Sequence, residues 1–170
     1  MASVSFRGVT IHTVGDLPEV GSVAPDFTLV GRTLAPVTMA EFVGKTLILN
    51  IFPSIDTPVC ATSVRRFYEL AGALPEAAVL NVSGDLPFAQ ARFCAAQELE
   101  FVQSGSSYRS TFGRDYGVAM TDGPLEQLLT RAVVAVQGGR VVYTQLVPDL
   151  GEEPDYGRVL RSLGWATSRV

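Results

Sequence analysis

Two cysteines and one histidine are the side chains in this sequence with the greatest capacity for nucleophilic or redox chemistry. A cysteine reacts as its thiolate, and a pair of cysteines can alternate between two thiols and a disulfide. Cys60 and Cys94 do not form a Cys-x-x-Cys motif, which argues against a disulfide oxidoreductase of the usual kind. Together with His12 they supply three soft ligands where a structural zinc site needs four, so we expect no metal centre.

The segment that precedes Cys60 indicates an activated sulfur. It follows an apolar run of strand length and reads PSIDTPVC from Pro53 to Cys60. Thr57 is a preferred N-cap residue and Pro58 suits the first helical position, which makes Cys60 the third residue of a helix. In a first turn, unpaired N–H groups and the positive end of the helix dipole favour a thiolate. The pattern therefore predicts a reactive Cys60.

Three other interpretations remain open at this point. Cysteine is among the most buried residue types, so both cysteines could be inert groups in a non-catalytic binding module. A secreted domain with one structural disulfide is a second alternative, although the sequence from Met1 to Asp16 lacks the apolar run of a signal peptide. A cysteine hydrolase is a third, and it would need His12 as its base. His12 lies in a short strand-like segment, which favours a surface imidazole.

Alternating strands and helices surround both cysteines. The apolar run Thr46–Phe52 predicts a strand, and apolar residues at helical spacing predict a helix over Pro58–Leu74. A second strand over Ala78–Val82 and a second helix over Pro87–Leu99 follow, and the second helix carries Cys94. A strand–helix–strand–helix order implies parallel pairing in an α/β sheet.

The remaining segments complete the predicted fold. Arg131–Val136 and Val141–Val147 flank Gly138-Gly139 as an antiparallel hairpin, and Pro154–Leu163 predicts a terminal helix. Residues 4–6 and 9–14 predict a short N-terminal hairpin. Residues 15–44 are rich in Gly and Pro and are expected to be mostly loop, with a short helix near Met39–Val43. We therefore predict one α/β domain over residues 1–170: a thioredoxin-like fold with a mixed central sheet flanked by helices and an added N-terminal β-hairpin.

The amino-acid composition argues against several classes of protein. The chain has 170 residues, 47% of them apolar and 18% charged, which is typical of a folded domain rather than a disordered chain. The net charge of −4 and the absence of a basic cluster argue against a nucleic-acid partner. No apolar run approaches the roughly 18 residues of a membrane span, so we expect no membrane association. Without a signal-like N-terminus, a cytoplasmic location is expected.

The motif around Cys60 resembles the Pro-x-x-x-Thr-x-x-Cys motif of peroxiredoxins. The longer run NIFPSIDTPVC, residues 50–60, is similar to that of bacterial thiol peroxidases, the atypical two-cysteine subfamily. The resemblance extends along nearly the whole chain. Further matching segments are VAPDFTL (23–29), DLPFAQARFC (85–94), YGV (116–118), DGPL (122–125), RAV (131–133) and EPDY (153–156).

This resemblance implies a role for each candidate site residue. Cys60 would be the peroxidatic cysteine, whose thiolate attacks a hydroperoxide and becomes a sulfenic acid. Thr57 would hold the thiolate and the peroxide, Pro53 would shield the pocket from water, and Arg131 would supply a nearby positive charge. Cys94 would be the resolving cysteine, which forms an intramolecular Cys60–Cys94 disulfide.

The resemblance also implies a substrate and partners. The family reduces hydrogen peroxide and organic hydroperoxides to water and alcohols in antioxidant defence, and thioredoxin restores the thiols. It needs no metal or organic cofactor, and its members form homodimers. Because Cys60 and Cys94 lie on different helices, we expect their Cα atoms to be more than ~7 Å apart in the reduced state, so that disulfide formation requires local unwinding.

Overall fold

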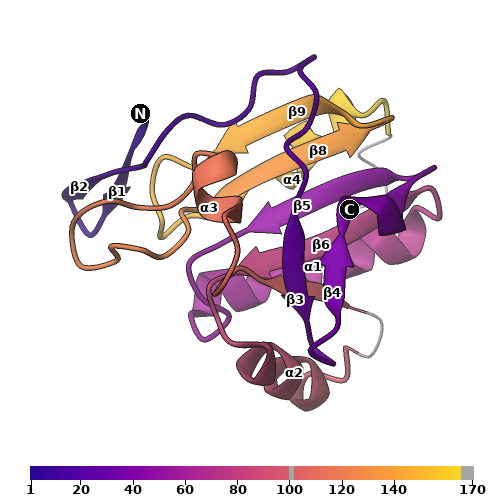
Figure 1. Ribbon diagram of the computed structural model, residues 1–170, viewed down its shortest axis with the longest axis horizontal. Helices are drawn as coiled ribbons and strands as arrows, with labels where there is room; N and C mark the ends of the chain where they lie inside the picture. Colours follow the sequence, from indigo (N-terminus) through magenta and orange to yellow (C-terminus); the bar gives the residue numbers. More distant parts are fainter. Residues whose placement is uncertain (100–101, 166–170) are drawn as a thin grey trace.

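A seven-stranded mixed sheet forms the centre of the computed structural model, which describes residues 1–99 and 102–165. The strand order is β4-β3-β7-β6-β5-β8-β9, and a separate two-stranded sheet, β1-β2, lies at one side (Figure 1). The bounds of the strands are β1 Ser3–Phe6, β2 Val9–His12, β3 Thr28–Gly31, β4 Pro36–Thr38, β5 Thr46–Ile51, β6 Ala77–Ser83, β7 Gln103–Ser106, β8 Ala132–Gln137 and β9 Arg140–Leu146. The helices are the 3-10 helix η1 Met39–Phe42 and the α-helices α1 Pro58–Ala73, α2 Pro87–Ala96, α3 Phe112–Asp115 and α4 Tyr156–Ser162.

The central strands are buried on both faces, which explains their nearly continuous apolar sequences. β5 pairs in parallel with β6 and antiparallel with β8, so the predicted mixed sheet is confirmed. Alternate residues of one strand point to opposite faces. Ile48 of β5 packs with Phe67 of α1 and Val159 of α4, while its neighbour Leu49 packs with Phe112 of α3 on the other face.

Two strands arise within residues 15–44, where mostly loop was expected. β3 and β4 form an antiparallel hairpin at the edge of the sheet. The Gly and Pro content concealed them because an edge strand tolerates Pro36, whose missing N–H leaves no ladder bond unmade. The short helix expected near Met39–Val43 is present as η1.

β7 and α3 were also missed from the sequence. β7 reads QSGS and carries no apolar side chain, yet most of it is buried because it lies between β3 and β6. Gly105 permits this close packing, since a Cβ at that position would lie 2.7 Å from a side-chain carbon of Leu29. A pattern based on apolar alternation could not detect such a strand.

The other predicted elements are present, with shifted ends. The expected helix over Pro87–Leu99 ends at Ala96, and the expected strand Arg131–Val136 begins at Ala132. Gly138 and Gly139 have φ values of +56° and +74° and form the predicted turn between β8 and β9. Within the described ranges, no helix is long and apolar enough to cross a membrane.

Candidate active site

Cys60 lies in the first turn of α1, which begins at Pro58 after the N-cap residue Thr57. Its side chain is fully buried, with a relative exposure of 0%. The sequence therefore placed this sulfur correctly at a helix N-terminus, where amide N–H groups favour an anion. The thiol is free and belongs to an apolar cluster that also contains Ile55, Val64 and Cys94.

Thr57 occupies the N-cap position, but its hydroxyl does not cap the helix. Its Oγ1 donates to the carbonyl oxygen of Ser54 at 3.1 Å, and no side-chain cap bond is made. The amides of the first turn are therefore not occupied by this hydroxyl. They remain available to an anion at Cys60.

The Arg131 guanidinium contacts the Cys60 sulfur. It directly precedes β8, the strand that pairs with β5, and only 1% of it is exposed. Its Nη2 lies 3.3 Å from the Cys60 Sγ and also donates to the Leu150 carbonyl oxygen at 3.0 Å. The guanidinium therefore places a positive charge beside the Cys60 sulfur in a buried site.

Two further nitrogen atoms of Arg131 mark it as more than a structural group. Nε and Nη1 are buried and have no hydrogen-bond partner among the described residues. Buried unpaired donors are rare in proteins, because leaving a donor without a partner costs about 1–3 kcal/mol. Both nitrogen atoms can still donate to a group that enters the site.

A cavity of about 430 Å³ opens next to this pair. Pro53, Thr57 and Arg131 line it, so three of the sequence-predicted site residues meet at one place, with Cys60 buried behind them. The remaining wall is largely apolar and includes the tip of the N-terminal hairpin. Its residues are Phe6, Arg7, Ser54, Pro58, Val59, Leu125, Leu128, Asp149, Leu150 and Gly151.

Cys94 lies in the last turn of α2, and only 3% of it is exposed. Burial raises the pKa of the Cys94 thiol, and the Arg32 guanidinium and the Ser104 hydroxyl partly oppose this effect. Cys94 is free and shares the apolar cluster of Cys60. The two sulfurs are therefore in the same part of the core, on different helices.

A buried amide network lies beneath the first turn of α1. Asn50 of β5 donates from Nδ2 to the Asn81 side chain at 2.8 Å and to the Ser63 hydroxyl at 3.2 Å. Ser63 in turn donates to the carbonyl oxygen of Cys60 at 2.8 Å. Sequence analysis gave these residues no role, although a polar Asn within an otherwise apolar strand was a usable signal.

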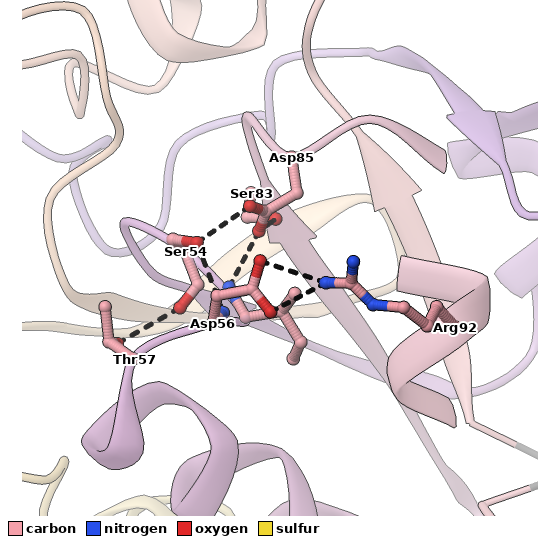
Figure 2. A network of polar contacts seen from close by, with 7 residues as sticks. Ser54, Asp56, Thr57, Ser83, Asp85 and Arg92 are labelled. Carbon is pink, nitrogen blue, oxygen red and sulfur yellow. Dashed lines mark hydrogen bonds and ion pairs between the residues drawn. The ribbon is translucent and has the colours of Figure 1, made fainter. Parts of the chain in front are cut away.

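Asp85 and Arg92 were also missed as site residues. The carboxylate of Asp85 contacts the loop that precedes Cys60, and Arg92 of α2 forms an ion pair with Asp56 of that loop at 2.9 Å (Figure 2). Both lie in the segment that carries Cys94. The two cysteine-bearing segments are thus tied together by polar contacts outside the apolar cluster.

His12 does not line the cavity next to Cys60. Its Nδ1 lies 2.6 Å from a carboxylate oxygen of Asp122, and about half of the side chain is exposed. The hydrogen bonds from His12 lower the pKa of Asp122. This arrangement agrees with a surface imidazole and leaves a hydrolase without its base.

Comparison with known proteins agrees with this geometry. The redoxin family matches residues 19–160. A thiol peroxidase of Mycobacterium tuberculosis is 54% identical over 165 residues, which cover 96% of this chain and 99% of that protein. The chain belongs to the bacterial thiol peroxidases. A thiol peroxidase of Corynebacterium glutamicum is 48% identical over 164 residues, again covering 96% of this chain and 99% of the relative.

A solved structure of similar shape supports the same assignment. The peroxiredoxin-like protein from Aquifex aeolicus superposes with a TM-score of 0.90 at 33% identity, covering 100% of this chain and 98% of that one. The thioredoxin-like architecture predicted from the sequence is confirmed. The family assignment supports a peroxidase and sets aside the interpretation of a non-catalytic module.

Proposed function

We propose that this thiol peroxidase reduces hydrogen peroxide and organic hydroperoxides through Cys60, as part of antioxidant defence. The observation that carries the proposal is the buried Arg131 guanidinium 3.3 Å from the Cys60 sulfur, beside a cavity open to a small substrate. The thiolate attacks the terminal oxygen of the peroxide, and the O–O bond breaks. The leaving oxygen takes a proton and departs as water or alcohol, while Cys60 becomes a sulfenic acid.

Arg131 fits this step in two ways. Its Nη2 donates to the attacking sulfur. Its Nε and Nη1, which have no partner among the described residues, can donate to the peroxide oxygens as negative charge develops on the leaving oxygen. Thr57 would direct its hydroxyl to the peroxide, which requires exchange of its present bond to Ser54. Pro53 would exclude water from its place in the cavity wall.

Cys94 would complete the cycle as the resolving cysteine. Its sulfur attacks the Cys60 sulfenic acid, a Cys60–Cys94 disulfide forms, and water leaves. A dithiol reductant, which the family implies is thioredoxin, then supplies two electrons and restores both thiols. We further propose, from the family, a homodimer located in the cytoplasm.

Thiol counting tests this proposal directly. One equivalent of hydroperoxide should remove both free thiols of the reduced protein within seconds. Cys94→Ser should instead react once, lose only the Cys60 thiol, and fail to support NADPH consumption with thioredoxin and its reductase. Full turnover of Cys94→Ser with thioredoxin would show that Cys94 serves only in packing.

The pH dependence of the resolution step provides a separate prediction. Because burial raises the pKa of the Cys94 thiol, little Cys94 is thiolate at neutral pH. The rate of disulfide formation from the Cys60 sulfenic acid should therefore rise with pH through the alkaline range. Acid quenching followed by mass spectrometry of the disulfide measures this rate. A rate that falls as pH rises would contradict attack by the Cys94 thiolate, whereas a flat rate would show that opening of the two helical segments limits the step.

A further inference from the structure

The carboxylate of Asp85 is the anchor point of the loop that precedes Cys60. One oxygen accepts a hydrogen bond from the Ser54 hydroxyl at 2.8 Å. The other accepts the backbone N–H of Ile55 at 2.7 Å and the hydroxyl of Ser83 at 2.6 Å. Figure 2 shows the carboxylate between the end of β6 and this loop. Hydrogen bonds to an ionised acceptor are roughly twice as strong as neutral ones.

Asp85 itself is held firmly by the scaffold. Its partner Ser83 is fully buried at the end of β6 and also accepts a hydrogen bond from Gln90 of α2 at 3.1 Å. The hydroxyl of Ser106, at the end of β7, donates to the Asp85 carbonyl oxygen. Three elements of the fold therefore fix the position from which this carboxylate reaches the loop.

A short chain of bonds leads from Asp85 to the catalytic geometry. The Ser54 hydroxyl, bound to Asp85, also accepts the N–H of Asp56 at 3.2 Å. The Ser54 carbonyl oxygen accepts the backbone N–H of Thr57 at 3.2 Å. Thr57 is the N-cap of α1, and Cys60 follows in its first turn. The location of Thr57 and of the Cys60 amides thus depends on a turn that Asp85 holds.

The Asp85 carboxylate lies where the loop that precedes Cys60 meets the segment that carries Cys94. Ile55, whose N–H it binds, is buried in the apolar cluster that contains both sulfurs. Asp56 forms an exposed ion pair with Arg92, two residues before Cys94. A surface pair of this kind contributes little alone, whereas the three bonds to Asp85 are partly buried. We expect disulfide formation to unwind the Cys60 loop, and separating residues 54–57 from Asp85 would break the bonds from Ser54 and Ile55.

We propose that Asp85 is a positioning residue that holds residues 54–57 in the arrangement required for peroxide reduction and releases them for disulfide formation. This inference rests on the proposed function. The hydrogen bonds of Asp85 are expected to have opposite effects on the rates of the two half-reactions. Reaction of Cys60 with peroxide requires the bonds, and resolution by Cys94 requires their loss.

Asp85→Asn tests the proposal with little change in shape. The amide removes the charge and places an N–H₂ group against donors that need acceptors. In a Cys94→Ser background, the second-order rate of sulfenic acid formation at Cys60 should fall about 10- to 100-fold, the loss expected for a displaced reacting group. With Cys94 present, the rate of disulfide formation from the sulfenic acid should be unchanged or faster.

Two further variants provide a graded test and a control. Ser54→Ala removes one of the three hydrogen bonds to the Asp85 carboxylate. It should lower the rate of sulfenic acid formation at Cys60 by a smaller factor than Asp85→Asn does. Asp16→Asn alters an exposed carboxylate that contacts the N-terminal amine, and it should change neither rate. The inference is overturned if the rate of sulfenic acid formation is unchanged in both Asp85→Asn and Ser54→Ala. It is also overturned if the rates of sulfenic acid formation and of disulfide formation fall equally, because a purely structural role would lower both. If the unmodified protein does not oxidise Cys60 with peroxide, the proposed function fails instead.

Discussion

Cys60→Ser is expected to abolish peroxidase activity, with a loss on the order of 10⁴-fold or more. The variant lacks the nucleophile, and a serine hydroxyl at this position is neither ionised nor able to form a sulfenic acid. The fold should survive, because serine is similar in size and its oxygen can accept the hydrogen bond that Arg131 now directs to the sulfur. Peroxide-dependent NADPH consumption with a thioredoxin system measures the effect.

The matched control is Cys94→Ser, which removes the other buried cysteine of the same apolar cluster. It should retain a single rapid reaction with peroxide, whereas Cys60→Ser should show none. Both variants should have unfolding midpoints close to that of the unmodified protein. Substantial turnover by Cys60→Ser would refute the assignment of Cys60 as the peroxidatic residue.

Arg131→Met should slow the reaction of Cys60 with peroxide by about 10²- to 10³-fold, the effect of removing a donor to a developing oxyanion. The free energy of unfolding should change little, because two contributions oppose one another. Arg131→Met removes two buried nitrogens that have no partner among the described residues, and it takes the donor away from the Leu150 carbonyl oxygen, a loss of about 1–3 kcal/mol. Stopped-flow kinetics and denaturant unfolding, performed on the same samples, separate the two effects.

Arg140→Met is the control for loss of one positive charge. Arg140 is exposed on β9 and donates to the Gly21 carbonyl oxygen, away from the cavity. It should leave the peroxide rate unchanged. If Arg131→Met reacts with peroxide as fast as Arg140→Met does, Arg131 has only a structural role.

The environment of Cys60 could be predicted because it is local. The N-cap, the proline and the cysteine lie within four positions, and backbone geometry alone then sets the sulfur near unpaired amides. Arg131 differs, since its approach to Cys60 depends on β8 pairing with β5. Residue patterns placed Arg131 at the start of a strand, and only the family resemblance connected it with the sulfur.

The parts that sequence analysis missed depend on tertiary neighbours. β7 is recognisable only from the close packing of Gly105 on Leu29, which no pattern within QSGS reveals. Asp85 follows a predicted strand and looks like an ordinary loop residue. Its three donors come from Ser83 nearby and from Ser54 and Ile55 about 30 positions away in sequence. The hydroxyl of Thr57, in contrast, turns away from the helix amides because of a local bond to the Ser54 carbonyl oxygen.

The hydrogen bond between Asn50 and Asn81 has a consequence for how the chain folds. β5 and β6 are uniformly buried, so a slip of two residues would keep the same faces inward and change the apolar packing little. Asn50 and Asn81 are direct register partners, and a slipped pairing would leave two amides buried without each other. A misaligned pairing of β5 with β6 therefore costs free energy relative to the native register. The end of β5, where the Cys60 loop begins, is placed to within one strand residue, or about 3.3 Å.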